Sequence, residues 1–218
     1  MGKTWTMTEN FGDSNSSNSQ RSPAWRPVLI NLVVFQLCWL ACVLSGAASL
    51  PAIGIGVVAA AVLYHLRNAA RPLPEAALLA IAGLIGAIWD GQLAGHGWLT
   101  YPSGEFARWI APSWIIAMWV AFATTLNVSL RWLRRRPGLS VLFGAIGGPL
   151  AFYAGERLGG VQFSDPLVAL AAVSAGWSLI TPVLVSLAAR LDGLADPTTT
   201  VPDPGRADHN PGEATSRV

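Results

Sequence analysis

The chain has 218 residues and a formal net charge of +2, with 52% hydrophobic and only 12% charged residues. The small net charge argues against a nucleic-acid-binding surface, and the high apolar content indicates a membrane protein. Ten tryptophans and 22 glycines fit that class, because glycine is more frequent in membrane helices than in soluble ones.

Six apolar stretches follow one another along the chain, each close to the roughly 20 apolar residues that a membrane-spanning helix needs. In chain order, the predicted spans are residues 28–46, 50–66, 76–96, 110–130, 139–158 and 166–189. The first stretch is longer than the roughly 7–15 apolar residues of a cleaved signal peptide, which favours an uncleaved span. The predicted fold is all-α: a polytopic membrane protein built as a bundle of six transmembrane helices.

Polar segments flank this bundle. Residues 1–26 are rich in Ser, Asn and Thr, and residues 191–218 are rich in Pro, Asp, Thr and Gly. Such compositions bury too little apolar surface to fold alone. We therefore expect a six-helix transmembrane domain at 27–190 between disordered tails at 1–26 and 191–218.

The arginines are distributed unequally between the two sides of a six-span chain. One side carries Arg21, Arg26, Arg67, Arg71, Arg131, Arg134, Arg135, Arg136 and Arg190. The other side carries only Arg108 and Arg157. Short loops rich in arginine stay in the cytoplasm, so both termini are expected to be cytoplasmic.

Two spans carry small residues at steps of three to five. In the fifth span these are Gly144, Gly148, Ala151, Gly155 and Gly159; in the third they are Gly83, Gly86, Gly91 and Gly95. Small residues at such spacing let neighbouring backbones approach closely. The pattern favours packing within one bundle; self-dimerisation is the alternative, and the oligomeric state stays open.

Asp90 is the clearest functional candidate, because it lies well inside the third span. An ionisable group at the bilayer centre costs at least about 2.5–3.5 kcal/mol, so it should face the bundle interior. Its role is either a structural hydrogen bond or a ligand or proton site. The tryptophans at nearly the same depth are Trp39, Trp89, Trp119 and Trp177. If they face inward, they line an aromatic cavity with one carboxyl group; otherwise they fill the core.

Other polar residues mark the two ends of the spans. Tyr153 and Glu156 lie near the outer end of the fifth span and are candidate members of the same ligand site, although Glu156 also fits an interfacial charge. Asn31, Gln36 and Asn127 lie in the inner halves of their spans. Amides there are expected to bridge helices as structural groups; a polar inner vestibule is the alternative.

Motifs for catalysis or metal binding are lacking in the sequence. Cys38 and Cys42 supply too few ligands for a metal site, and His96 has no partner at metal-ligand spacing. Tyr64 and His65 fit interface anchoring. We expect no metal and no cofactor; enzymatic activity stays undecided, and the lack of a catalytic motif weighs against it.

Several short patterns resemble one bacterial family. They are Asn31 with Phe35-Gln36-x-x-Trp39, Trp89-Asp90, Pro112-x-Trp114, Thr125-Leu126-Asn127 and Gly144-Ala145-x-Gly147-Gly148-Pro149. Over about residues 28–190 the chain resembles bacterial inner-membrane proteins catalogued as domain of unknown function 2878. The resemblance implies a multi-pass bundle in the bacterial inner membrane, of undetermined activity and sometimes grouped with lipid-modifying genes.

Two function classes follow. The first is a protein that handles a lipid or a small apolar molecule in a pocket around Asp90 toward the outer face. Transport within this class is disfavoured, because no repeat relates spans 1–3 to spans 4–6. The second class is a non-catalytic scaffold or partner subunit of a membrane complex. The expected partners are the lipid bilayer and such a ligand, and not nucleic acid.

Overall fold

The computed structural model describes residues 25–194, in which six α-helices account for most of the chain. They are α1 (Trp25–Ala47), α2 (Pro51–Arg67), α3 (Pro72–Gly95), α4 (Ser113–Leu126), α5 (Pro137–Arg157) and α6 (Pro166–Arg190). A 3-10 helix, η1 (Arg131–Arg135), precedes α5, and two short strands, β1 (Leu99–Thr100) and β2 (Gln162–Phe163), pair with each other. The all-α prediction is confirmed.

Proline residues define where four of the helices begin. Pro51, Pro72, Pro137 and Pro166 each stand at the first helical position, where the missing N–H removes no helical hydrogen bond. Asp165 caps α6, because its side chain accepts hydrogen bonds from two backbone N–H groups of the first turn.

Four helices, α1, α3, α5 and α6, are long and apolar enough to cross a membrane. The other two, α2 and α4, are apolar but have only 17 and 14 residues. The span expected at 110–130 is a helix only from Ser113 to Leu126, about 21 Å at 1.5 Å per residue. Pro112 precedes the first turn of α4, and the helix ends before Asn127. Helix length alone therefore supports four membrane spans, and not the six expected.

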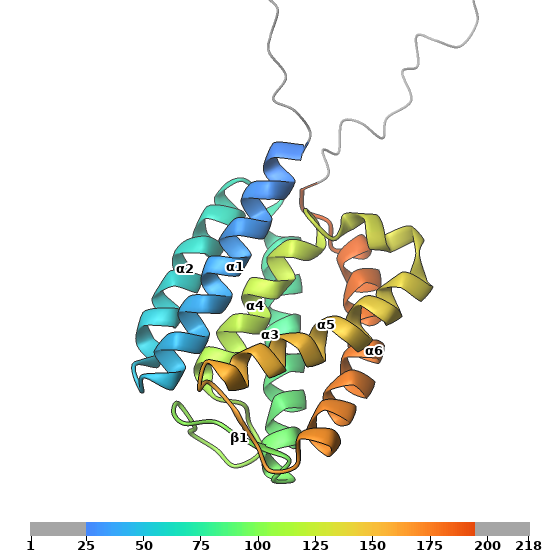
Figure 1. The fold of residues 1–218 in the computed structure, drawn as a ribbon. Helices are drawn as coiled ribbons and strands as arrows, with labels where there is room; N and C mark the ends of the chain where they lie inside the picture. Colours follow the sequence, from blue (N-terminus) through green and yellow to red (C-terminus); the bar gives the residue numbers. More distant parts are fainter. Residues whose placement is uncertain (1–24, 195–218) are drawn as a thin grey trace, which may run out of the picture.

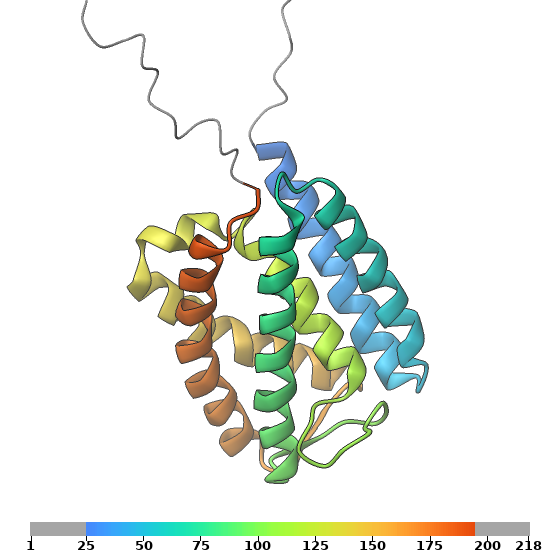
Figure 2. The same cartoon turned by 180° about the vertical axis from the view of Figure 1, so that it is seen from behind.

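The helices form one bundle in which α1, α2 and α4 pack together, α3 packs against α4, and α5 packs against α6. Figure 1 shows α5 crossing obliquely in front of α6, and Figure 2 shows α3 on the opposite face of the bundle. The described chain begins and ends at the same end of the bundle (Figure 1).

Long-range contacts tie the loops together at each end. At one end, Leu99 pairs with Phe163, so the α3–α4 and α5–α6 connections lie side by side. At the other end, the backbone N–H of Arg71 donates to the carbonyl of Gly193 at 2.8 Å. The folded region therefore extends past the expected boundary at 190, to residue 194. The remaining parts of the expected tails, 1–24 and 195–218, lie outside the described residues.

Glycines on α3 and α5 make room for tryptophans on neighbouring helices. A Cβ at Gly86 would lie 2.0 Å from Cγ of Trp119, and one at Gly148 would lie 2.5 Å from Cγ of Trp177. Gly144 faces the backbone of α6, where a Cβ would lie 2.1 Å from the carbonyl oxygen of Trp177. These small residues thus serve helix packing within the bundle.

Candidate functional site

Asp90 and Trp119 meet inside the bundle. Asp90 is 1% exposed on α3, and Nε1 of Trp119 on α4 donates a 2.6 Å hydrogen bond to its Oδ2. The Trp119 ring in turn stacks on Trp177 of α6, with ring centroids 4.4 Å apart and an interplanar angle of 22°. One contiguous set of side chains therefore connects α3, α4 and α6.

Trp119 and Trp177 form part of the wall of an apolar cavity of about 130 Å³, which we call the tryptophan cavity. Its lining residues are Phe35, Trp39, Met118, Trp119, Phe122, Phe143, Gly147, Gly148, Ala151 and Trp177. Its volume compares with the roughly 150 Å³ apolar cavities that hold a benzene-sized molecule. The cavity has room for a small apolar molecule or a segment of an alkyl chain.

A shallow groove on the surface of α5 adjoins the tryptophan cavity, because Phe143 and Gly147 line both. The groove has a volume of about 360 Å³, and its other lining residues are Trp132, Leu139, Leu142, Ile146 and Leu150. All of these side chains are apolar. The groove gives an apolar approach to the cavity from the side of the bundle.

The structure places the other candidate residues away from the tryptophan cavity. Trp89 packs on Gly176 of α6, and its indole nitrogen has no hydrogen-bond partner among residues 25–194. Tyr153 is 51% exposed, Glu156 is half-buried, and neither lines the cavity. Asp90 does not line the cavity itself, but it is hydrogen-bonded to Trp119, which does. A binding role for these residues stays a prediction.

Asn31 and Gln36, two of the candidate structural amides, differ in their hydrogen bonds. Asn31 connects α1 to the α4 region, because its Nδ2 donates to the carbonyl of Thr124 at 3.1 Å and its Oδ1 accepts from Ser129 Oγ at 2.6 Å. Gln36 is exposed on α1 and makes no hydrogen bond within the described part of the chain. The amide of Gln36 therefore faces the surroundings of the bundle.

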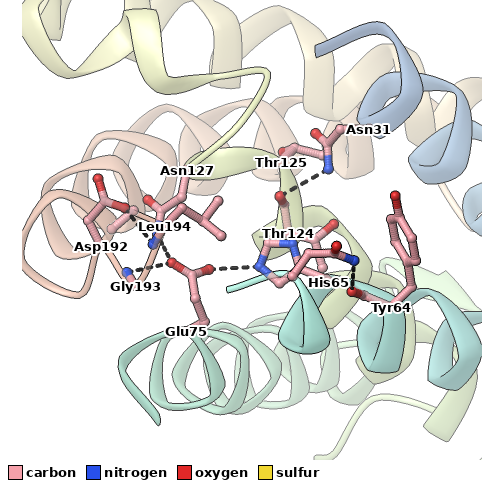
Figure 3. Close-up of polar contacts among 12 residues, drawn as sticks. Asn31, Tyr64, His65, Glu75, Thr124, Thr125, Asn127, Asp192, Gly193 and Leu194 are labelled. Atoms are coloured by element: carbon pink, nitrogen blue, oxygen red, sulfur yellow. Dashed lines mark hydrogen bonds and ion pairs between the residues drawn. The ribbon is translucent and has the colours of Figure 1, made fainter. Parts of the chain in front are cut away.

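Asn127, the third amide, belongs to a buried network that sequence reasoning did not find (Figure 3). At its centre is Glu75, in the first turn of α3, whose side chain is 0% exposed. Its Oε2 accepts from Nε2 of His65 at 2.8 Å, and its Oε1 accepts from Nδ2 of Asn127 and from the backbone N–H of Gly193. The carboxylate thereby joins α2, α3, α4 and the segment after α6.

Asp192 forms the second half of this network. Its Oδ2 accepts hydrogen bonds from Arg131 and from Arg134, and its carbonyl accepts from Arg71 at 2.6 Å. Arg134 also donates to Oδ1 of Asn127, which connects the two carboxylates. Burial alone would raise the pKa of Asp192, but the hydrogen bonds from the two arginines outweigh it, and the net effect lowers the pKa.

The sequence contained a signal for Glu75 that the span boundary at residue 76 concealed. Pro72 fits the first position of a helix, which places Glu75 in the first turn, where the helix dipole favours a carboxylate. The position of His65 at the end of an apolar run predicts interface anchoring. The structure instead buries its ring against Glu75.

The described residues, 25–194, form no candidate metal site. Among residues 25–194, no group of three or more His, Cys, Asp or Glu side chains lies close enough together to hold a metal ion. Cys38 and Cys42 are buried in the core as free thiols. The interactions described above are apolar contacts, hydrogen bonds and ion pairs between arginine and carboxylate groups.

Comparison with known proteins identifies the family and nothing narrower. No curated protein and no solved structure matches the chain. The model of a family described as protein of unknown function (DUF2878) matches residues 28–183, which is well over half of the chain. The resemblance seen in the sequence is confirmed, and the protein belongs to the DUF2878 family.

Proposed function

We propose that this protein spans the bacterial inner membrane six times, with both termini in the cytoplasm, and holds a lipid chain or another small apolar molecule in the tryptophan cavity. The observation that carries the binding proposal is the cavity itself. Trp39, Trp119 and Trp177 surround an apolar space inside the bundle, and an apolar groove adjoins it. Apolar walls with few polar groups are typical of small-molecule sites.

The exposed faces of α1 and α2 support an environment of hydrocarbon around the bundle. On α1, the large aliphatic side chains that are at least 38% exposed are Leu29, Ile30, Leu32, Val33, Leu37, Leu40 and Leu44. On α2, Ile53, Val57 and Leu63 are similarly exposed. Apolar surface of this extent in water would be a liability. We therefore include α2 and α4 as membrane spans. Both are shorter than the other four helices, and both pack against neighbouring helices of the bundle.

Asp90 acts in this proposal by positioning Trp119. Its hydrogen bond fixes the indole ring at one edge, while stacking on Trp177 fixes the face of the ring. A rigid aromatic wall reduces the conformational entropy that is lost when a ligand binds. The ligand itself enters along the groove on α5, past Phe143 and Gly147.

A cavity-filling substitution tests the binding. A Cβ at Gly147 would have only Cε1 of Phe143 nearby, at 3.9 Å, so the side chain of Gly147→Leu starts in open space where the cavity adjoins the groove. The control is Gly56→Leu on α2, where a Cβ meets nothing within 4 Å. In detergent, a brominated fatty acid should quench wild-type tryptophan fluorescence saturably, and the saturable part should disappear in Gly147→Leu and persist in Gly56→Leu. Equal quenching in all three proteins would contradict the proposal.

A scaffold role is the second candidate, favoured by the observation that Asp90 bonds Trp119 and does not line the cavity. Complementation of a deletion strain, followed by untargeted lipid and metabolite analysis, distinguishes the two. A ligand-handling protein should lose function in Gly147→Leu while Gly56→Leu restores the wild-type profile. A scaffold should be restored by both variants and by Asp90→Asn, with no lipid class altered in the deletion strain.

A further inference from the structure

A second cavity, of about 850 Å³, lies at the end of the bundle where the described chain begins and ends, between α1, α2 and the end of α4. Its lining residues are Arg26, Pro27, Val28, Ile30, Asn31, Val34, Ala61, Tyr64, His65, Asn68, Thr124, Asn127, Val128, Arg131 and Leu194. We call it the arginine-end cavity. It shares no lining residue with the tryptophan cavity, so an inference from it stands independently of the proposed function.

The charge in the arginine-end cavity has one sign. Arg26 and Arg131 line it, and none of its described lining residues is Asp or Glu. Arg26 is exposed and forms no ion pair within residues 25–194, whereas Arg131 is 44% exposed and bonds Asp192. Guanidinium groups match the oxygens of phosphate and carboxylate groups.

His65 supplies a fixed imidazole in the wall of this cavity. Its Nε2 donates to the fully buried Glu75, which holds the orientation of the ring. Within the described chain its Nδ1 makes no hydrogen bond. The ring is therefore a preoriented polar group that lines the same cavity as two arginines, held by a carboxylate that does not itself line the cavity.

The remaining lining includes five apolar residues, Val28, Ile30, Val34, Ala61 and Val128. A lining that combines arginines with apolar side chains suits an amphiphile whose head carries negative charge. The volume lies within the roughly 300–1,000 Å³ typical of small-molecule sites.

We propose that the arginine-end cavity binds a phosphate-bearing anion. The phosphate oxygens accept hydrogen bonds from Arg26 and Arg131, and His65 contacts the same group. Asn127 links this site to the Glu75 and Asp192 network, so an occupied cavity also braces the end of the bundle. The phosphate comes either from the headgroup of an anionic phospholipid or from a soluble phosphate ester, and the two share the same recognition chemistry.

Binding assays on the full-length protein in dodecyl maltoside test this site. Native mass spectrometry compares phosphatidylglycerol with phosphatidylcholine, and calorimetry uses sn-glycerol 3-phosphate as the soluble probe. We expect Arg26→Gln to weaken phosphatidylglycerol binding about fivefold, equivalent to ~1 kcal/mol. Arg67→Gln is the control, because Arg67 is exposed on α2 and does not line the cavity. Ala61→Phe, which fills the cavity without a change of charge, should weaken binding similarly.

The outcomes separate cleanly. A headgroup site is supported if the protein prefers phosphatidylglycerol and if Arg26→Gln and Ala61→Phe weaken that binding. A site for soluble phosphate esters is supported if the protein also binds sn-glycerol 3-phosphate. Equal losses in Arg26→Gln and Arg67→Gln would show diffuse surface attraction and overturn the proposal. Binding of neither probe would also overturn it. Gly147→Leu should leave phosphatidylglycerol binding unchanged. A failure of the phosphate-site proposal is therefore distinguishable from a failure of the tryptophan-cavity proposal.

Discussion

Replacing Glu75 by leucine tests whether the buried carboxylate holds the arginine-rich end of the bundle together. The side chain is 0% exposed and accepts three hydrogen bonds from His65, Asn127 and Gly193. Leucine is of similar size but accepts none of them. His65 can adjust by changing tautomer, whereas the amide of Asn127 and the backbone N–H of Gly193 lose their acceptor.

The magnitude follows from those two stranded donors. A buried donor without a partner costs about 1–3 kcal/mol, so Glu75→Leu should lower the free energy of unfolding by about 2–6 kcal/mol. Glu75→Gln keeps one acceptor oxygen for Asn127 and Gly193, but it loses the charge and replaces the oxygen that accepts from His65 with an NH2 group. We expect a loss of about 1–2 kcal/mol for it, because hydrogen bonds to charged groups are the stronger ones.

The assay is SDS-induced unfolding in mixed micelles, followed by far-UV circular dichroism. The matched control is Glu105→Leu, because Glu105 is exposed in the α3–α4 connection, and it should change stability by less than about 0.5 kcal/mol. If Glu75→Leu unfolds at the same SDS fraction as Glu105→Leu, the carboxylate does not hold this end, and the reasoning about the network is wrong.

Three further predictions concern pH, packing and topology. The lowered pKa of Asp192 means that its stabilisation is complete above the ordinary value of 3.8 and is lost as pH falls through the folded-state pKa, so Asp192→Asn should flatten the acid limb of unfolding stability. Gly86→Ala should cost about 1–3 kcal/mol, because its Cβ would overlap an indole ring. Gly56→Ala, with open space around it, should gain up to ~1 kcal/mol. An alkaline-phosphatase fusion should be active at Gly104 and inactive at Pro137; the reverse pattern would overturn the orientation.

Burial of the candidate residues depended on partners distant in sequence. Depth within the third span correctly indicated that Asp90 is buried, because an ionisable group in an apolar helix must turn inward. The choice of Trp119 as its partner, 29 residues away, follows from how α3 and α4 cross. Tyr153 lies near the outer end of the fifth predicted span, and the rotation of α5 leaves it exposed.

Local composition alone determined the class of the protein, the helical architecture, the approximate limits of the helices and the unequal distribution of arginines. These properties depend on residues close in sequence, through hydropathy, proline position and charge. The tertiary structure alone decided which side chains share a cavity and that Glu75 bonds Gly193, 118 residues away. It also shortened α4 and extended the folded chain to residue 194. Such contacts depend on the rotation and crossing of whole helices, which are determined by packing across the bundle and not by any single stretch of sequence.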